Sequence, residues 1–217
     1  MACIERKGGH LLVVSGPSGV GKGTVCKELI GRGIDGLGLS VSATTRKPRS
    51  GEVNGINYCF KPFDEFESMV KNGELLEYAN VHGNYYGTPK RFVFDEMEKL
   101  NDIILEIDIQ GAAQVKKNYP DAILIFIMPP TFGDLIKRIY NRGTESEEDI
   151  KKRMINAHFE ILAAEHYDYL VINENVIEAT DQIVSIIIAE RCRRDRFILD
   201  YDCFVYKEEK NDISNTI

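Results

Sequence analysis

The chain has no tryptophan and no long apolar run. Its longest apolar stretches, Ala122–Met128 and Ile183–Ala189, fall well short of the roughly 18 residues that a membrane-spanning helix needs. The segment from Met1 to His10 contains no apolar stretch of the kind found in a signal peptide. The sequence therefore predicts neither a membrane protein nor a secreted one, and we expect a cytoplasmic location.

Cysteine is sparse and shows no pairing pattern. The five cysteines are odd in number, widely scattered and contain no CxxC pair: Cys3, Cys26, Cys59, Cys192 and Cys203. This usage is typical of a protein in the reducing cytosol, so we expect free thiols. The spacing of these cysteines does not favour a zinc site either.

An excess of basic residues is also missing. Lys and Arg number 27 against 34 for Asp and Glu, which gives a formal net charge of −7. A general nucleic-acid-binding protein needs a basic face, so this balance argues against one. At first sight the balance also argues against an enzyme that handles phosphates. At 217 residues and 43% hydrophobic, the chain can form one compact domain with a sizeable core.

Short apolar segments alternate with helical patterns along most of the chain. The segments Leu11–Ser15, Ile103–Ile107, Ala122–Met128 and Tyr169–Asn173 read as buried strands. This alternation predicts an α/β fold with a parallel sheet and helices on both faces. The expected helices span residues 22–32, 90–100, 112–117, 132–140, 147–166 and 176–196.

The stretch from about residue 40 to 90 interrupts this alternation. It predicts short β pieces such as Tyr58–Phe60, a strand over Leu75–Val81 and a loop over Gly83–Pro89. Between them, Asp64 reads as the N-cap of a helix that runs to about Lys71, with Glu67 completing a capping box. We expect a separate, small, β-rich lobe.

The most informative motif follows the first strand. It has the pattern of a phosphate-binding loop: Gly16, Pro17, Ser18, Gly19, Val20, Gly21, Lys22, Gly23 and Thr24. The glycines let backbone N–H groups close around phosphate oxygens, and Lys22 supplies a mobile cation for the β- and γ-phosphates. Because Gly23 stands where a hydroxyl is usual, Thr24 either binds Mg²⁺ through water or contacts phosphate.

Two further groups of charged residues point to phosphate chemistry. Arg46 and Arg49 lie in a stiff loop, where their guanidinium groups can fork around one phosphate, although a solvated basic loop also fits. Asp108 follows the apolar strand 103–107, the position of a Walker B carboxylate near Mg²⁺. The alternative for Asp108 is the N-cap of the next helix.

A phosphate-binding loop alone leaves the phosphate acceptor open, but five ordered motifs narrow the choice. Across residues 11 to 173 the chain contains GPSGVGKGT, SVSATTRKPRSGEVNGINY, LLEYANVHGNYYGTP, LEIDIQG and NRGTESEEDIKKR. In these motifs the chain resembles the guanylate kinase family, whose members transfer phosphate from ATP to GMP. The resemblance implies a fold of the P-loop NTPase type, with an inserted GMP-binding lobe and a helical lid.

The resemblance also assigns roles to individual residues. Arg46, Arg49, Tyr58 and Tyr86 would hold the GMP phosphate. Guanine would be read by Ser42, Glu77 and Thr88, while Glu106 and Asp108 would lie near the acceptor and the metal. A carboxylate at Glu77 can accept hydrogen bonds from both N1–H and the 2-amino group of guanine, whereas adenine would leave it unpaired at a cost of about 1–3 kcal/mol.

A charged segment near residue 140 matches the family's lid. Arg142 and Arg153 match arginines that close over the ATP phosphates, and Arg138 is a third candidate for that role. A solvated charged turn fits the composition of this segment equally well. Asn173 matches a position near the donor adenine. For the later arginine cluster, Arg191–Arg196, we expect interaction with solvent and with the dipole of the preceding helix.

The resemblance implies a magnesium-dependent ATP:GMP phosphotransferase in which Lys22, Arg46, Arg142 and Arg153 stabilise charge during transfer. Its core would comprise residues 1–38, 90–135 and 167–200, its GMP lobe 39–89, its lid 136–166 and a polar tail 201–217. ATP and GMP are the expected partners, and monomer and homo-oligomer both stay open. Two alternatives are a related kinase for a substrate such as a ribose bisphosphate, and a non-catalytic guanylate-kinase-like binding module.

Overall fold

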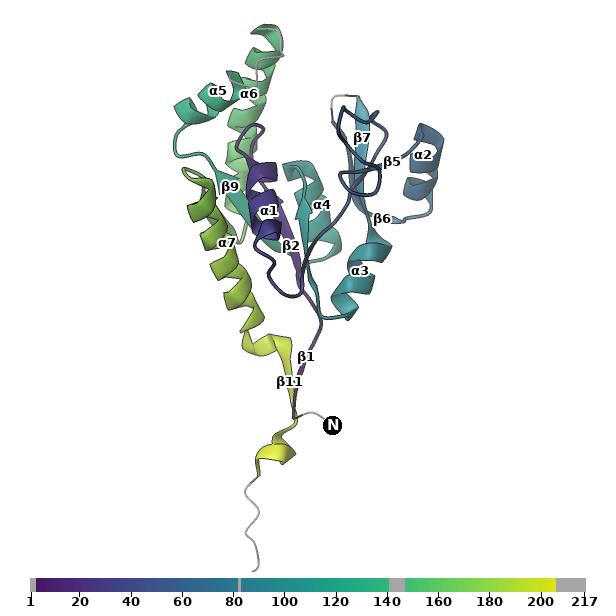
Figure 1. Cartoon of the computed structure of the whole chain (residues 1–217), viewed down its shortest axis with the longest axis vertical. Helices are drawn as coiled ribbons and strands as arrows, with labels where there is room; N and C mark the ends of the chain where they lie inside the picture. The colour runs from purple at the N-terminus through teal and green to yellow at the C-terminus, as the bar shows by residue number, and fades with distance from the viewer. Residues whose placement is uncertain (1–2, 82, 141–146, 206–217) are drawn as a thin grey trace, which may run out of the picture.

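The centre of the molecule is a parallel sheet. The computed structural model describes residues 3–81, 83–140 and 147–205, with no side-chain detail for 147–152. Five strands lie in the order β10-β9-β2-β8-β3 (Figure 1). Their bounds are Tyr169–Ile172 (β10), Ile123–Met128 (β9), Leu11–Ser15 (β2), Asp102–Glu106 (β8) and Leu37–Leu39 (β3). Each neighbouring pair is parallel, as the sequence predicts.

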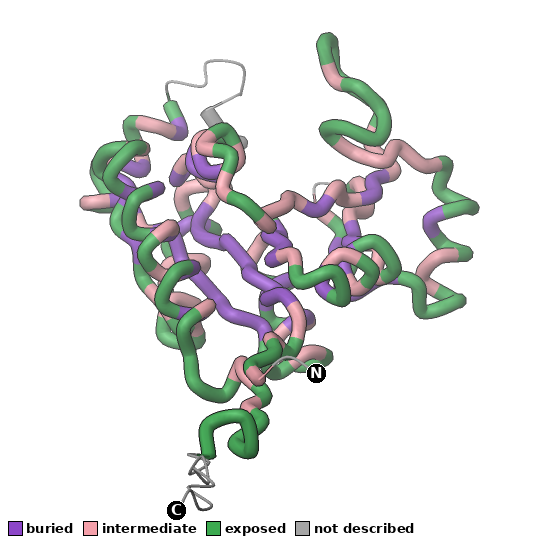
Figure 2. The backbone as a smooth tube through the Cα atoms, turned by 60° about the horizontal axis from the view of Figure 1, so that its bottom comes forward, coloured by how far each residue is buried: buried purple, intermediate pink, exposed green. Residues whose placement is uncertain are grey.

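Helices cover both faces of this sheet. Alternate residues of one strand enter different cores: Leu12 and Val14 of β2 belong to one buried cluster, and Leu11 and Val13 to the other. Figure 2 shows the resulting run of buried backbone through the middle of the molecule. Helices α1 (Lys22–Gly31), α5 (Phe132–Tyr140), α6 (Glu147–Leu162) and α7 (Val176–Arg191) contribute to the first cluster, and α3 (Lys90–Glu98) and α4 (Ile109–Asn118) to the second. The α/β fold with two covered faces is thus confirmed.

A second, smaller sheet lies beside the first. Its four strands have the order β5-β4-β7-β6, with bounds Cys59–Phe60 (β5), Ala43–Thr44 (β4), Asn84–Pro89 (β7) and Leu75–Val81 (β6). Helix α2 (Phe63–Lys71) packs on it through Phe66, which is buried with Ala43 and Leu75. In Figure 1 this sheet and the α5–α6 pair stand on opposite sides of the carboxyl ends of the central strands.

A two-stranded sheet joins a segment near the start of the chain to one near residue 200. Strands β1 (Ile4–Arg6) and β11 (Phe197–Leu199), neither of which the sequence predicts, pair antiparallel. Short 3₁₀ helices span Ala163–His166, Arg194–Arg196 and Tyr201–Phe204. The pairing brings Cys3 and Cys203 within disulfide reach, with their Cα atoms 5.7 Å apart, and they form a disulfide. The expectation of five free thiols was therefore wrong.

Two local predictions were also wrong. The segment expected as a loop over Gly83–Pro89 contains strand β7, because it pairs along β6 in a hairpin. Asp64 does not cap α2, which begins at Phe63 after Pro62. Asp64 instead lies in the first turn, where its negative charge interacts favourably with the helix dipole.

The arginines after α7 do not simply face solvent. Helix α7 ends at Arg191, whose Nε donates to the fully buried Asp102 at 2.6 Å. Arg196 donates to the carbonyls of Gly8 and Gly9 at 3.1 and 3.0 Å. These two arginines hold the end of α7 against the central sheet, so the solvent interpretation was wrong for them. No helix within the described residues is long and apolar enough to span a membrane.

Candidate active site

The phosphate-binding loop connects β2 to α1 at the carboxyl end of the central sheet. The backbone of this loop adopts conformations that favour glycine, as Gly16 and Gly21 show. At Gly16 φ is 147°, and a Cβ would lie 2.3 Å from the Ile127 carbonyl oxygen. At Gly21, the N-cap of α1, φ is 100°, and a Cβ would lie 2.8 Å from Nδ2 of Asn173. No side chain caps α1, so its first turn can receive an anion.

Lys22 is folded against the loop that precedes it. Its Nζ donates to the carbonyl oxygens of Gly16 and Pro17 at 2.7 and 3.3 Å. Burial lowers the pKa of Lys22, while the carboxylates of Glu160, Glu106 and Asp108 oppose this and raise it. The ammonium group thus lies among carboxylates contributed by β8, the turn after it and helix α6.

Helix α6 contacts the loop at Ser18. Oε2 of Glu160 accepts a hydrogen bond of 2.7 Å from the Ser18 N–H, and Nη2 of Arg153 donates to the Ser18 hydroxyl at 3.0 Å. Glu160 was not among the predicted site residues. Arg142, the other arginine expected in the lid, lies outside the described residues.

Arg138 and Asn173 hold the far side of the loop. Arg138 donates to the carbonyls of Val20 and Asn173 at 3.0 and 2.8 Å, and the Asn173 amide donates to Val20 at 2.8 Å. Oδ1 of Asn173 is buried without a hydrogen-bond partner among the described residues. A cavity of 350 Å³ opens beside Arg138, lined by Pro130, Asp134, Lys137, Arg138 and Glu174.

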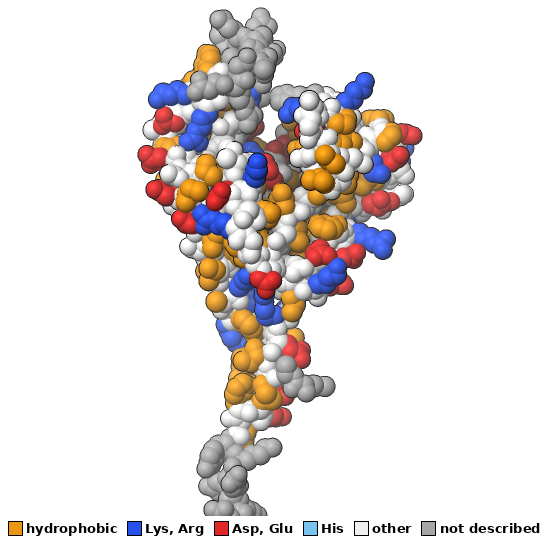
Figure 3. Space-filling view, viewed as in Figure 1, with side chains coloured by type: hydrophobic (Ala, Val, Ile, Leu, Met, Phe, Trp, Pro, Cys, Tyr) orange, Lys and Arg blue, Asp and Glu red, His pale blue; other side chains and the backbone are white. Residues whose placement is uncertain are grey.

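A second cavity, of 270 Å³, lies between the phosphate-binding loop and the smaller sheet. The surface is hollowed between these two parts of the molecule (Figure 3). The cavity brings together most of the residues that the sequence predicts to bind the acceptor. Its polar lining consists of Lys22, Ser42, Arg46, Arg49, Tyr58, Glu77, Tyr86, Glu106 and Asp108.

Glu77 is the buried carboxylate of this cavity. It lies on β6, is 4% exposed, and accepts a 2.7 Å hydrogen bond from the hydroxyl of the fully buried Thr88. Burial raises the pKa of Glu77 to about 7; the Thr88 hydrogen bond lowers it, and nearby Asp108 raises it. A Cβ at Gly111, in the first turn of α4, would lie 2.7 Å from Oε2 of Glu77, so the helix approaches the carboxylate closely.

Arg46 is held in position by Glu52, which sequence reasoning missed. The two guanidinium nitrogens contact the two carboxylate oxygens at 2.9 Å each, and Glu52 also accepts from the Arg49 N–H at 2.7 Å. The guanidinium group lies 5.3 Å from the centre of the Tyr58 ring, and the Tyr58 and Tyr86 rings meet edge to face. The planar guanidinium group of Arg46 thus lies beside the Tyr58 ring in the wall of the cavity.

The acids at the end of β8 face the phosphate-binding loop. Oε1 of Glu106 would lie 3.2 Å from a Cβ at Gly23, and desolvation by the surrounding protein raises the pKa of Glu106 while Lys22 lowers it. Asp108 is the N-cap of α4: its Oδ1 accepts from the Gly111 N–H at 2.8 Å. The N-cap alternative for Asp108 is therefore correct, and it leaves Oδ2 without a donor among the described residues.

Comparison with known proteins identifies the family of the chain. The guanylate kinase family model matches residues 8–190. The chain belongs to the guanylate kinase family. The guanylate kinase of Caldanaerobacter subterraneus subsp. tengcongensis is 53% identical over 191 residues, which cover 88% of this chain and 92% of the relative. That of Halalkalibacterium halodurans is 49% identical over 205 residues, covering 94% and 100%.

A solved guanylate kinase shares the fold as well. The crystal structure of guanylate kinase from Anaplasma phagocytophilum aligns with a TM-score of 0.75 and 35% identity, covering 90% of this chain and 92% of that chain. Guanylate kinases are ATP:GMP phosphotransferases.

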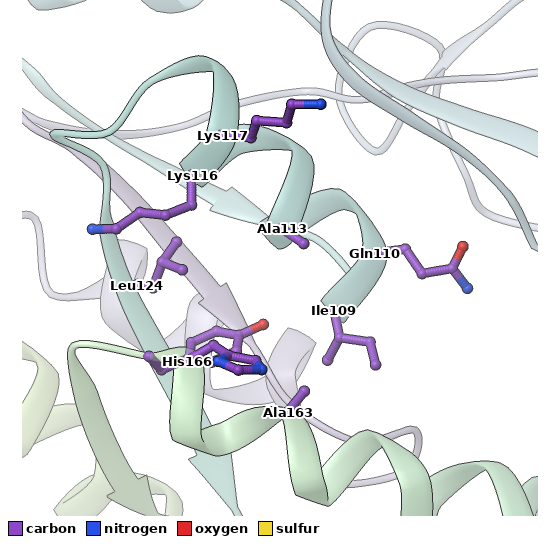
Figure 4. Close-up of a pocket in the computed structure, with 9 residues that line it drawn as sticks. Ile109, Gln110, Ala113, Lys116, Lys117, Leu124, Ala163 and His166 are labelled. Atoms are coloured by element: carbon purple, nitrogen blue, oxygen red, sulfur yellow. The ribbon is translucent and has the colours of Figure 1, made fainter.

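A further cavity, with an apolar lining, lies apart from the phosphate-binding loop. It measures 540 Å³ and lies between α4, β9 and the 3₁₀ helix 163–166 (Figure 4). Ile109, Ala113 and Leu124 line it, with the Lys116 and Lys117 side chains extending away from it. Of the cations at its edge, Lys116 is already engaged, because its Nζ donates to the Ala122 carbonyl at 2.7 Å and to Asp168 at 3.1 Å.

Proposed function

We propose that this chain transfers the γ-phosphate of ATP to GMP and releases ADP and GDP. The observation that carries this proposal is the 270 Å³ cavity, which joins a buried carboxylate, an arginine fork and the phosphate-binding lysine in one space. A related kinase for a ribose bisphosphate would not need a buried guanine-reading carboxylate. A non-catalytic module would not need Lys22 in a phosphate-binding loop. Relatives at about half identity named guanylate kinases also favour the first function.

In this proposal Glu77 reads the guanine. Its ionised carboxylate accepts from N1–H and the 2-amino group, the Thr88 hydroxyl holds it in place, and Ser42 completes the pocket. Adenine presents an acceptor at N1 and no 2-amino group, so it would leave a buried carboxylate unpaired. This difference makes the acceptor site selective for GMP over AMP.

The GMP phosphate binds the cationic wall of the same cavity. Arg46 presents a planar fork that matches phosphate oxygens, Arg49 adds a second cation, and the phenols of Tyr58 and Tyr86 donate. Because Glu52 accepts from Nη1 and Nη2 of Arg46, the guanidinium group is ordered before substrate arrives, and its Nε–Nη2 edge serves the phosphate. The acceptor oxygen then faces Glu106 and the phosphate-binding loop.

The ATP phosphates bind the loop from Gly16 to Thr24. Lys22 leaves the carbonyls of Gly16 and Pro17 to neutralise the β- and γ-phosphates, and the uncapped amino end of α1 adds its dipole. Arg138, Arg142 and Arg153 surround the transferred phosphoryl group as the lid closes and water leaves. The unpartnered Oδ1 of Asn173 supports its place beside the adenine, whose amino group is a donor.

Asp108 and Thr24 fit an Mg²⁺ site. Hard oxygen donors suit this ion, and Oδ2 of Asp108 has no donor among the described residues, although Asp108 caps α4. When bound, Mg²⁺ would neutralise charge on the β- and γ-phosphate oxygens, with Asp108 and Thr24 holding it through water. No side chain acts as a nucleophile; Lys22, Arg46, Arg142 and Arg153 align the two phosphates and stabilise the charge that develops between them.

In this proposal, different segments of the chain have different roles in the reaction. The core spans about 1–38, 90–135 and 167–200, residues 39–89 form the GMP lobe, 136–166 the lid and 201–217 a tail. A cytoplasmic location is part of the proposal, since ATP is the co-substrate. The test is to incubate the protein with ATP, GMP and Mg²⁺ and to quantify ADP and GDP. The proposal requires equal amounts of both products and their loss in Lys22→Ala; ADP without GDP would refute it.

A further inference from the structure

Helix α6 presents one face to the phosphate-binding loop. Arg153, Ala157 and Glu160 lie at spacings of four and three residues, which places them on the same side of a helix. Ala157 is fully buried in the core, so it fixes this face against the body of the molecule. On either side of it, Arg153 and Glu160 both reach Ser18.

The Glu160 carboxylate accepts a hydrogen bond from a backbone N–H group of the kind that binds phosphate. A phosphate-binding loop holds its anion by backbone N–H groups, and the Ser18 N–H donates to Oε2 of Glu160 at 2.7 Å. Of the charged groups that raise the pKa of Lys22, Glu160 has the largest effect, so its negative charge also reaches the lysine. Glu160 thus interacts with both the Ser18 N–H and the Lys22 ammonium group of the loop.

We propose that Glu160 is an internal competitor of the nucleotide phosphates and sets the affinity of this chain for ATP. The inference rests on the proposed function, because it assumes that the loop from Gly16 to Thr24 binds the ATP phosphates. A carboxylate and a phosphate cannot both accept from one N–H at full strength, and the two negative charges repel. ATP therefore binds only as Glu160 releases the Ser18 N–H.

Glu160→Gln is the variant that isolates the charge. The substitution preserves size and shape and removes the negative charge from the loop. We expect ATP to bind roughly fivefold to twentyfold more tightly, as for loss of one charged competitor of a hydrogen-bond donor. KM for ATP falls by a similar factor while KM for GMP stays the same. Glu165→Gln is the matched control, since Glu165 follows closely in the chain and its side chain is 75% exposed.

Inorganic tripolyphosphate serves as a probe for the phosphate subsite alone. Calorimetry with tripolyphosphate should show the same gain in affinity for Glu160→Gln as ATP does, and adenosine should show none. Glu160→Ala removes the acceptor as well as the charge, so it should also bind ATP more tightly. Its thermal unfolding, compared with and without ATP, separates a folding defect from the binding effect.

The outcomes separate this inference from the proposed function. Wild-type protein that binds neither ATP nor tripolyphosphate would overturn the proposed function and the inference together. If wild type binds ATP but Glu160→Gln binds it equally or more weakly, Glu160 is no competitor and only the inference fails. Tighter binding of ATP and tripolyphosphate by Glu160→Gln, with Glu165→Gln unchanged, supports it.

Discussion

The Thr88 hydroxyl donates a 2.7 Å hydrogen bond to Oε1 of Glu77, and both side chains are buried between β6 and β7. The hydrogen bond orients a carboxylate whose remaining acceptor positions face the cavity. Since a buried carboxylate is costly to leave unpaired, this pair links guanine selectivity to the stability of the fold.

Glu77→Gln should separate the two substrates. Replacing one carboxylate oxygen by an amide places a donor against the guanine donors, so we expect kcat/KM for GMP to fall about 100-fold or more. The dissociation constant for ATP should stay within about twofold, because Glu77 does not contact the phosphate-binding loop. Steady-state kinetics and calorimetry check this, with Glu98→Gln, an exposed acid on α3, as the control. An equal loss for both nucleotides would refute the guanine-reading role.

The raised pKa of Glu77 predicts how guanine binding depends on pH. The carboxylate must be ionised to accept from guanine, and burial raises its pKa to about 7. Affinity should therefore increase about tenfold per pH unit below 7 and level off above it. Guanosine is the probe, because it lacks the titrating phosphate of GMP. Glu77→Gln should bind guanosine with no such pH dependence; a parallel dependence in the variant would assign the titration to another group.

The same pKa has a consequence for folding. Between pH 4.5 and about 7 the folded chain keeps a proton on Glu77 that the unfolded chain has lost. The free energy of unfolding should therefore fall as pH rises through this window, by up to about 3 kcal/mol from this group. Glu77→Gln removes this loss, so it should be more stable than wild type at pH 8 and similar at pH 4.5. Urea unfolding at both pH values measures the difference.

Arg46→Lys should weaken binding of the GMP phosphate and leave guanine binding intact. Lysine keeps the charge but cannot form the two-pronged contact that Arg46 makes with Glu52. We expect the dissociation constant of GMP to rise about tenfold or more, and that of guanosine to stay the same. Arg91→Lys is the control, since the Arg91 side chain on α3 is 94% exposed. A matching loss of guanosine binding would indicate that Arg46 shapes the base pocket instead.

The disulfide should matter for stability and not for turnover. Cys3 and Cys203 are 200 residues apart in sequence. Their bond joins the segments that flank β1 and β11, and these strands lie at the end of the molecule away from the turn between β2 and α1 (Figure 1). Reduction, or Cys203→Ser, should lower the free energy of unfolding by about 3–5 kcal/mol. Cys192→Ser, at an exposed free thiol, should not. Rates of GDP formation should be equal in all three proteins; unfolding midpoints unaffected by reductant would contradict the role of the bond.

The sequence predicted the parts of this site that are local and missed those that depend on the fold. The phosphate-binding loop is recognisable because its glycines and Lys22 lie close together in the sequence. Glu160 contacts Ser18 from 142 residues away, so no spacing in the chain reveals it. The Cys3–Cys203 bond depends likewise on the pairing of β1 with β11, two three-residue strands too short to show a pattern. Strand β7 was missed because its glycine and proline resemble a loop until β6 pairs with it.

The central claim is that one cavity combines guanine recognition with phosphate transfer. Its most direct test is the initial rate of ADP formation with ATP and Mg²⁺ against GMP, AMP, CMP and UMP in turn. The account predicts a kcat/KM for GMP at least about 100-fold above that for AMP, since only guanine satisfies the buried Glu77 carboxylate. A preference for AMP or UMP over GMP would contradict it.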